Sequence, residues 1–293
     1  MSILKILLLA AIQGAAELLP VSSSAHVILA EKLMGLDPSA PDMTFLLVML
    51  HTGTMGAAIV FFWKRWLGRL RSAGKEFLYQ IILATAFTGF LGLALKKVIE
   101  KCLEVFAGQP KGEIENLFSN LPLIALALFA AGALILWASR RGGGVSGDSH
   151  NGVAASGSSI SRPDSVAIGL VQGLCLPFRG FSRSGATISV ALMRGLTRET
   201  AEEFSFALSV ALTPPVIGLE LVRLMKHAKA TGVHVALGDL LLPGILGMGL
   251  AFIAGLGALR WLSSWLESGK WQYFGYYCVG FALLMGGVAA AGF

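Results

Sequence analysis

The sequence predicts an all-α integral membrane protein built as an inverted-topology repeat, in which each half has a re-entrant helical hairpin and three transmembrane helices. The first observation is the composition. Of the 293 residues, 55% are apolar and only 14% are charged, and the mean hydropathy is +0.72, which is too apolar for a water-soluble chain of this length. The other two observations are six long apolar runs and two interrupted apolar segments that resemble each other.

Six apolar runs approach the roughly 20 residues that cross about 30 Å of hydrocarbon. Lipid cannot satisfy backbone hydrogen bonds, so each run is expected to be a helix. The predicted spans lie at about residues 43–63, 76–95, 121–139, 203–225, 240–262 and 271–292. Thirty-six glycines fit closely packed membrane helices, because small residues let backbones approach.

The two interrupted segments, residues 3–33 and 165–194, share one order of features. The first contains "AAIQGAAELLPVSSSAHVI" and the second "GLVQGLCLPFRGFSRSGATISV". Each has Gln-Gly, then Leu-Pro, then a Ser-rich polar turn, then a second apolar stretch. Breaks at Pro20 and near Gly180 leave backbone groups that must be buried in protein or line a wet cavity. Both segments are therefore expected to be re-entrant hairpins.

Three runs follow each hairpin, so the chain divides into halves at about 1–140 and 164–293, joined by the Gly/Ser-rich linker 141–163. Three spans after a returning hairpin place the second hairpin on the opposite face, which makes the repeat inverted. The two polar turns can then meet within the membrane. The alternatives are chance similarity and, for residues 3–33, a signal peptide, which the second copy at residue 165 argues against.

Basic residues give the chain a net charge of +6 and lie mostly in short loops, which indicates contact with lipid headgroups rather than with nucleic acid. The positive-inside rule assigns the more basic face to the cytoplasm and both termini to the outside. That face receives Lys64, Arg65, Arg69, Arg71, Lys75, Arg140, Arg141, Arg162, Arg194, Arg198, Arg260 and Lys270.

Ionisable side chains in a membrane segment are costly, and Glu17 is the clearest case because no basic residue lies one helical turn away. Its partner is expected to be a metal ion or the arginine of the other hairpin. Gln13 precedes Glu17 by four residues, so both face the same side of the helix. His51, on a predicted span, either bridges to this site or satisfies a helix–helix hydrogen bond, and the second role is the one expected.

Three serines, Ser22, Ser23 and Ser24, follow the break in the first hairpin, and His26 lies within a turn of them. One serine is enough to cap the second half-helix. A serine near a histidine and a carboxylate is suited to nucleophilic attack, and the same groups can bind a metal or activate water. The spacing alone does not choose among these roles.

The second hairpin contributes "RGFSRSGAT", where Arg183 stands between Ser182 and Ser184, and Thr187 lies four residues on. Hydroxyls, amides at a helix start and a guanidinium together suit a tetrahedral oxyanion such as phosphate. Combined with the first hairpin, they predict phosphoryl transfer or hydrolysis. The alternative is a transporter or flippase of a phosphorylated lipid, because broken helices in inverted repeats are also transporter architecture.

The motifs "QGAAELLPVSSSAH" and "GFSRSGAT", followed by "EEFSFALSVALTPP", resemble the signature regions of the bacterial undecaprenyl pyrophosphate phosphatase family, the bacitracin-resistance type. The resemblance covers essentially the whole chain. It implies a multi-pass enzyme of the bacterial inner membrane that removes the terminal phosphate from undecaprenyl pyrophosphate, recycles the lipid carrier for peptidoglycan synthesis and gives bacitracin resistance. It also implies a periplasmic active site and dependence on Mg²⁺ or Ca²⁺. A homodimer is one oligomeric state that the sequence leaves open.

The family's motifs fall on particular positions of this chain. The resemblance implies metal binding by Glu17 and Gln13 and catalytic roles for Glu17, Ser23, His26 and Arg183. It implies phosphate binding by Ser22, Ser182, Arg183, Ser184 and Thr187. Where the family often has Pro-Gly, this chain has Arg179-Gly180, so Arg179 is expected either to contact phosphate or to lie at the membrane interface.

Overall fold

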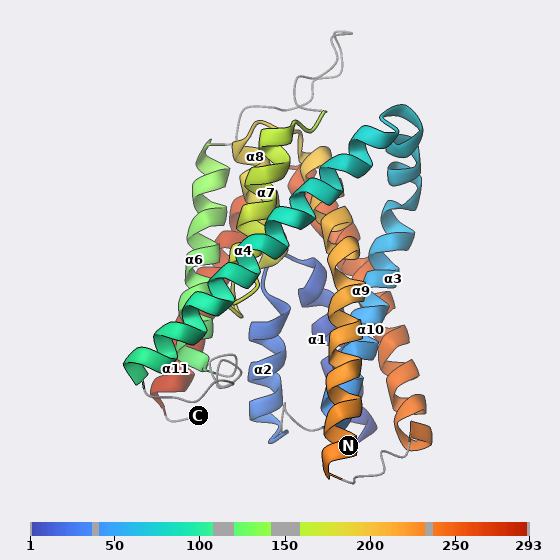
Figure 1. Cartoon of the computed structure of the whole chain (residues 1–293), viewed down its shortest axis with the longest axis vertical. Coiled ribbons are helices and arrows are strands. Elements are labelled where there is room, and N and C mark those ends of the chain that lie inside the picture. Colours follow the sequence, from blue (N-terminus) through green and yellow to red (C-terminus); the bar gives the residue numbers. More distant parts are fainter. Residues whose placement is uncertain (1, 37–40, 108–119, 142–158, 232–236, 292–293) are drawn as a thin grey trace.

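The computed structural model describes residues 2–36, 41–107, 120–141, 159–231 and 237–291 (Figure 1). All regular elements in these ranges are helices, as predicted. They are α1 (Ile3–Leu18), α2 (Ser23–Leu33), α3 (Pro41–Ser72), α4 (Lys75–Ala107), α6 (Leu121–Arg141), α7 (Arg162–Cys175), α8 (Arg183–Met193), α9 (Arg198–Thr231), α10 (Leu237–Glu267) and α11 (Trp271–Ala290).

Five of the described helices, α3, α4, α6, α10 and α11, are long and apolar enough to cross a membrane. The chain is therefore a multi-pass membrane protein. These helices contain five of the six predicted spans, while the sixth, 203–225, lies in α9, where some of its side chains fall outside the described set. Of the predicted linker, residues 142–158 also lie outside the described part of the chain.

Helix α4 has 33 residues, more than the predicted span needs. At about 1.5 Å per residue it is about 50 Å long, so it either tilts or extends beyond a bilayer core about 30 Å thick. Figure 1 shows α4 crossing the molecule diagonally. This tilt separates the far end of α4 from the helices that its first turns contact.

The two hairpins enter from opposite ends of the bundle. In Figure 1, α1 and α2 open toward the lower end, and α7 and α8 open toward the upper end. The packing between the halves is reciprocal, because α1 lies mainly on α10 of the second half while α7 lies mainly on α4 of the first half. This arrangement is consistent with the predicted inverted repeat.

Glycines allow the hairpins to pack closely against these spans. A Cβ at Gly169 would lie 2.3 Å from the Ala84 carbonyl oxygen, and a Cβ at Gly14 would lie 2.7 Å from the Ala251 carbonyl oxygen. Neither contact is sterically acceptable. Glycine at both positions therefore lets α7 rest on α4 and α1 rest on α10 backbone to backbone, as small residues do in membrane bundles.

We expect Gly169→Val to reduce the free energy of unfolding by about 1–3 kcal/mol, because the added atoms overpack the contact with α4. The midpoint of thermal unfolding in detergent measures the change. Gly257→Val on α10 is the matched control, since nothing lies within 4 Å of a Cβ there. Equal midpoints for the two variants would show that the α4–α7 contact is not tightly packed.

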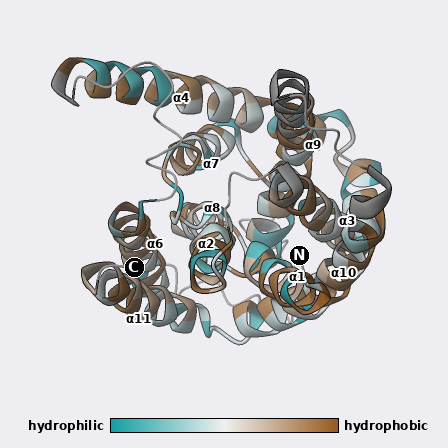
Figure 2. Cartoon of the chain, turned by 90° about the horizontal axis from the view of Figure 1, so that it is seen from below, coloured by the Kyte–Doolittle hydropathy of each residue, from teal (hydrophilic) through white to brown (hydrophobic). Residues whose placement is uncertain are grey.

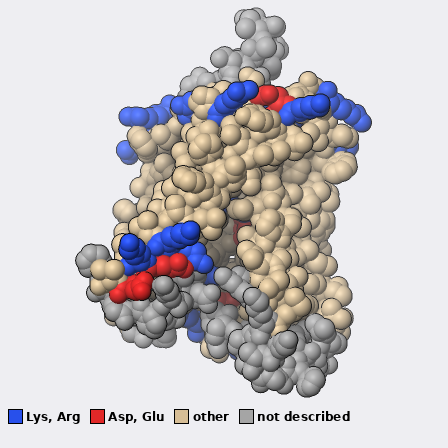
Figure 3. Space-filling model, in the orientation of Figure 1, with Lys and Arg blue, Asp and Glu red and all other residues tan. Residues whose placement is uncertain are grey.

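The ends of the bundle differ in charge. Lys and Arg form a band around the upper end in Figure 3, and a smaller cluster of both signs lies at the lower left. At the upper end Arg69 contacts Glu203, and the Ser263 hydroxyl donates a 2.5 Å hydrogen bond to Glu202. These contacts fasten the first turns of α9 to α3 and α10. Between the two ends, hydrophilic residues lie on the central helices α1, α2 and α8 (Figure 2).

Candidate active site

The break in the first hairpin is held by its serines. Helix α1 ends before Pro20, and Ser22 caps α2, its hydroxyl accepting a bond from the Ala25 amide. Ser22 has φ 67°, the one positive φ among the described non-glycine residues. Such a backbone conformation costs energy in L-residues and concentrates at functional sites. The predicted break and serine cap are confirmed.

The other two serines make different contacts. The Ser23 hydroxyl donates a 2.5 Å hydrogen bond to Oε2 of Glu17, and the Ser24 hydroxyl accepts a 3.2 Å bond from the Gly180 amide of the second hairpin. The three serines, which sequence spacing could not distinguish, therefore divide among capping, contact with the carboxylate and contact between hairpins.

The second hairpin turns at a glycine that the packing requires. Gly180 has φ +100°, and a Cβ there would lie 2.3 Å from the Ile124 carbonyl oxygen of α6. Ser182 caps α8 by accepting a bond from the Gly185 amide, so the N-terminus of α8, with its partial positive charge, points toward the first hairpin. The Ser184 hydroxyl donates to the Leu19 carbonyl and ties the two turns together.

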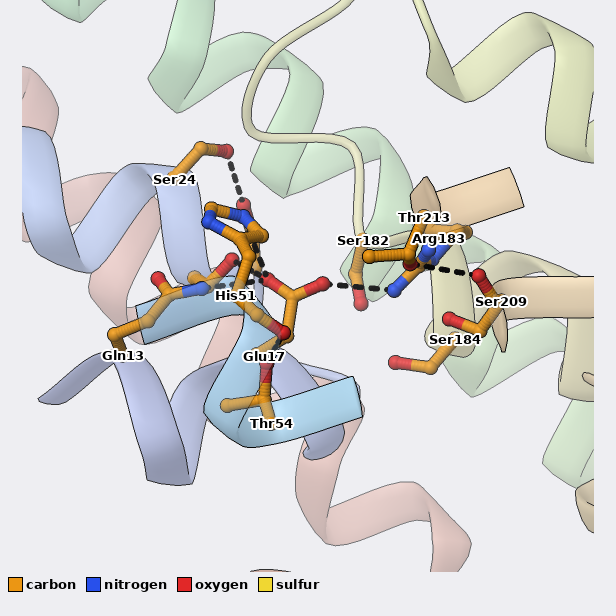
Figure 4. Close-up of polar contacts among 12 residues, drawn as sticks. Gln13, Glu17, Ser24, His51, Thr54, Ser182, Arg183, Ser184, Ser209 and Thr213 are labelled. Carbon is orange, nitrogen blue, oxygen red and sulfur yellow. Dashed lines mark hydrogen bonds and ion pairs between the residues drawn. The ribbon is translucent and has the colours of Figure 1, made fainter. Parts of the chain in front are cut away.

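Glu17 is the centre of the polar contacts in Figure 4. Its Oε1 accepts a 2.8 Å bond from Nη2 of Arg183, so the predicted partnership between the carboxylate and the arginine of the other hairpin is confirmed. Oε2 accepts bonds from Ser23 and from the Gln13 amide at 3.1 Å. The Glu17 side chain is only 15% exposed, so these partners replace the water that a carboxylate would otherwise bind.

A cavity of about 100 Å³ lies between the two hairpins. A buried water needs about 10–15 Å³ by the same measure, so the cavity has room for a group larger than one water. Serine hydroxyls and a guanidinium, which are donors expected for a phosphate group, line it together with the Glu17 carboxylate. The lining residues are Ala16, Glu17, Leu19, Ser22, Ser23, Ser24, Phe181, Ser182, Arg183 and Ser184.

Four predicted site residues lie outside this lining, namely His26, Thr187, Arg179 and Gln13. His26 Nδ1 donates to the Ser22 carbonyl at 2.8 Å, so Nε2 of the neutral ring accepts from the Tyr277 hydroxyl at 2.7 Å. The ring also stacks on Phe281 of α11 with centroids 4.0 Å apart. In this arrangement the hydrogen-bonding atoms of His26 serve α2 and α11, not the cavity.

Thr187 and Arg179 also lie outside the lining, as does Gln13, which is bonded to Glu17. Thr187 is fully buried, and its hydroxyl lies 2.6 Å from that of Ser205 on α9, so it joins two helices. Arg179 is exposed, and its charge interacts with Glu31 on α2. Of the two roles expected for Arg179, direct phosphate contact has no counterpart in the lining of this cavity.

His51 lies at the site, the less favoured of the two roles that the sequence left open for it. It lies on α3 with Nε2 3.7 Å from Oε2 of Glu17, and Nδ1 donates to the Leu47 carbonyl of its own helix. A second, smaller pocket beside Glu17 and Arg183 is lined by His51 and Thr54 of α3 and by Ser209, Val210 and Thr213 of α9, with Leu18, Met55 and Ala58. The signal in the sequence was the polar group His-Thr-Gly-Thr inside an apolar span.

The described residues contain no group of three or more His, Cys, Asp or Glu side chains that could hold a metal by themselves. Magnesium, however, is commonly bound through one or two carboxylates together with substrate phosphates. Glu17, the one carboxylate in the cavity lining, fits that pattern when phosphate oxygens complete the ligand set. Gln13 presents its amide N–H to Glu17 and would have to turn its oxygen toward an ion.

Fold and site together define a multi-pass membrane protein in which two broken hairpins from opposite ends of the bundle build a buried site for an oxyanion. The model of the bacitracin resistance protein BacA family matches residues 6–284. The chain belongs to this family.

Individual relatives are similar along almost their entire length. An undecaprenyl-diphosphatase 2 of Acinetobacter baylyi is 56% identical over 287 residues, which cover 96% of each chain. An undecaprenyl-diphosphatase of Desulfosudis oleivorans is 35% identical, over 94% of this chain and 93% of the relative. An undecaprenyl-diphosphatase 2 of Burkholderia ambifaria is 32% identical, over 95% and 94%.

Proposed function

We propose that this protein is an undecaprenyl-diphosphatase, which hydrolyses undecaprenyl diphosphate to undecaprenyl phosphate and inorganic phosphate. The observation that carries the proposal is the set of contacts around Glu17, where a serine of one hairpin and the arginine of the other bind opposite oxygens of one carboxylate beside a phosphate-sized cavity. Family membership and full-length similarity to named diphosphatases support the same reaction. The product returns the lipid carrier to peptidoglycan synthesis, and the family's name connects this activity with bacitracin resistance.

The first step follows from the 2.5 Å hydrogen bond between Ser23 and Glu17. A nucleophile bonded to a base is poised for covalent catalysis. Glu17 removes the hydroxyl proton while Ser23 Oγ bonds to the terminal phosphorus, and the bond from that phosphorus to the bridging oxygen breaks. Undecaprenyl phosphate leaves with the bridging oxygen. Water then attacks the phosphoserine, which releases inorganic phosphate and restores the Ser23 hydroxyl.

Arg183 and the backbone amides at the start of α8 stabilise the negative charge of the phosphate. Negative charge on the transferred phosphoryl oxygens grows or redistributes in the transition state, and fixed donors in a site with little water stabilise it most. To reach the phosphate, Arg183 must share its guanidinium between Glu17 and the substrate, which its five N–H donors permit. Glu17 and the phosphate oxygens would hold Mg²⁺ or Ca²⁺, and such an ion offsets phosphate charge.

The proposed location is the inner membrane, with the site open to the periplasmic side. A band of basic residues surrounds the upper end of the bundle, where α3 connects to α4. By the positive-inside rule, this band supports a cytoplasmic position for the upper end. The first hairpin, which carries Ser23 and Glu17, enters from the opposite end (Figure 1). The diphosphate group would therefore reach the cavity from the outer face.

The function is tested by phosphate release from undecaprenyl diphosphate by purified protein in detergent, with Mg²⁺ or Ca²⁺ and then with a chelator. We expect turnover by the wild type, loss of turnover on chelation, and at least about a hundredfold loss in Glu17→Gln, which keeps the shape of the side chain but removes the base. Detergent removes the membrane that a transporter needs. Binding of the lipid without any phosphate release would overturn the enzyme assignment in favour of transport.

A further inference from the structure

Two equivalent helix–helix contacts between the halves differ in how closely they pack. Helices α3 and α10 pack closely through glycines, since a Cβ at Gly53 would lie 2.3 Å from the Met248 carbonyl oxygen. In the inverted repeat α9 is equivalent to α3 and α4 is equivalent to α10, so the equivalent contact is the one between α9 and α4. These two helices meet at Phe77 and Phe204, whose ring centroids are 6.4 Å apart, and have far less contact than α3 and α10.

One face of α9 shows where this contact ends. Phe204 and Leu208 lie on the face that meets α4, and both are fully buried. Side chains three and four residues apart continue the same face of a helix. The next four residues on it are all exposed, namely Ala211, Pro215, Gly218 and Val222. No atom lies within 4 Å of the place where a Cβ at Gly218 would be.

Figure 3 shows a hollow at this place, between α4 and α9, with acidic atoms visible in its depth. We call it the α4–α9 opening. Beyond Leu208 the exposed surface of α9 is largely apolar, because Val216, Leu219 and Val222 are each more than 40% exposed. Helix α9 therefore presents hydrocarbon-like surface at the depth of the spans, where water is scarce.

Helix α9, which forms one side of the opening, also carries polar residues of the candidate active site. Ser209 and Thr213 of α9 line the small pocket that also contains Glu17 and Arg183, and the side chain of His51 in this pocket is 38% exposed. Pro214 and the proline after it have no N–H, so two carbonyls of the preceding turn lose their helical partners. Carbonyls freed in this way at membrane depth must be buried in protein, bonded by neighbouring side chains, or line a wet cavity. The surface of α9 therefore changes from polar beside the active site to apolar farther along the helix.

We propose that the prenyl tail of the substrate leaves the active site through the α4–α9 opening and lies along the exposed face of α9. The proposal rests on the proposed function, which supplies a ligand with a diphosphate head and a long apolar tail. Such a ligand matches this change from polar to apolar surface, with its head between the hairpins and its tail in the opening. The α3–α10 contact offers no equivalent path, because these two helices pack closely through glycines.

The test is to narrow the opening with Gly218→Trp and to compare two substrates. Gly218 lies five residues beyond Thr213, or about 7.5 Å farther along the helix, so a C55 tail passes it and a five-carbon prenyl tail does not. We expect Gly218→Trp to raise KM for undecaprenyl diphosphate at least tenfold and to leave kcat/KM for dimethylallyl diphosphate within twofold of wild type. Gly257→Trp on α10, which also has open space at its Cβ, is expected to change neither.

Equal effects of Gly218→Trp on both substrates, or no effect on either, would overturn the proposal and favour bulk lipid as the occupant. If Gly218→Trp does not fold, Val222→Trp on the same face replaces it.

A second experiment does not depend on catalysis. In a Cys102→Ala background, undecaprenyl phosphate is expected to slow maleimide labelling of Gly218→Cys at least threefold but not of Gly257→Cys. Protection without hydrolysis would overturn the enzyme assignment alone, and hydrolysis without protection would overturn the tail path alone.

Discussion

Ser23→Ala is expected to lower turnover of undecaprenyl diphosphate by at least about a thousandfold, the scale seen when a nucleophile that works with a base is removed. The physical reason is the 2.5 Å bond between Ser23 and Glu17, which no other serine of the hairpin makes among the described contacts. Steady-state phosphate release measures the loss. Ser264→Ala, an exposed serine on α10, is the control and is expected to keep full activity.

The same variant separates covalent catalysis from direct attack by water. If Ser23 is the nucleophile, acid quenching of the wild type during turnover with terminally labelled substrate traps labelled phosphoserine, and Ser23→Ala traps none. A wild type at full turnover that never carries label would contradict the covalent step. Ser23 would then only orient the phosphate while Glu17 activates water, a role already compatible with its position in the cavity lining.

Arg183→Ala is expected to reduce kcat by about a hundred- to a thousandfold, because the guanidinium is the strongest fixed charge available to the transferred phosphoryl group. Arg183→Lys keeps the charge but loses the forked geometry that holds Glu17 and phosphate together, so partial recovery is expected. The measurement is kcat and KM for each variant. Arg194→Ala is the matched control, since Arg194 caps the C-terminus of the same helix, pairs with Asp164 and is not in the cavity lining.

Stability must be followed beside activity in these variants. Arg183→Ala leaves Glu17 buried without its opposite charge, and removing one partner of a buried pair is generally destabilising. The double variant Glu17→Gln with Arg183→Ala removes both charges and is expected to unfold at a higher temperature than Arg183→Ala while remaining inactive. An Arg183→Ala protein with wild-type kcat would show that the phosphate is stabilised without this arginine.

Much of the site was predictable because its chemistry is unusual for a membrane. Glu17 and Arg183 are charges where lipid makes them costly, so a sequence can mark them as functional and as partners for each other. Pro20 and Gly180 mark the breaks for equally local reasons, a missing N–H and a required φ of +100°. In the structure, α1 and α2 lie on either side of the Pro20 break, and α7 and α8 lie on either side of the Gly180 turn.

Repeat symmetry predicted less about the site. Gln13 and Gln172 occupy equivalent places in the two copies, but Gln13 bonds to Glu17 whereas Gln172 is fully buried and bonds to Thr88 of α4. The position equivalent to Glu17 is Leu176. The site is therefore built from unlike contributions of similar hairpins, and the difference lies in contacts with helices far away in the sequence.

Composition, periodicity and proline or glycine breaks act over a few residues. They were therefore enough to predict a membrane environment, the helices, the two hairpins and the residue types of a phosphate site. Which side chains share that site depends instead on the packing of distant helices. This packing brought His51 of α3 to Glu17, turned His26 toward Tyr277 and assigned Thr187 to Ser205. The physical reason is that side-chain direction depends on how tilted helices cross, and crossings are set by packing between residues that are distant along the chain.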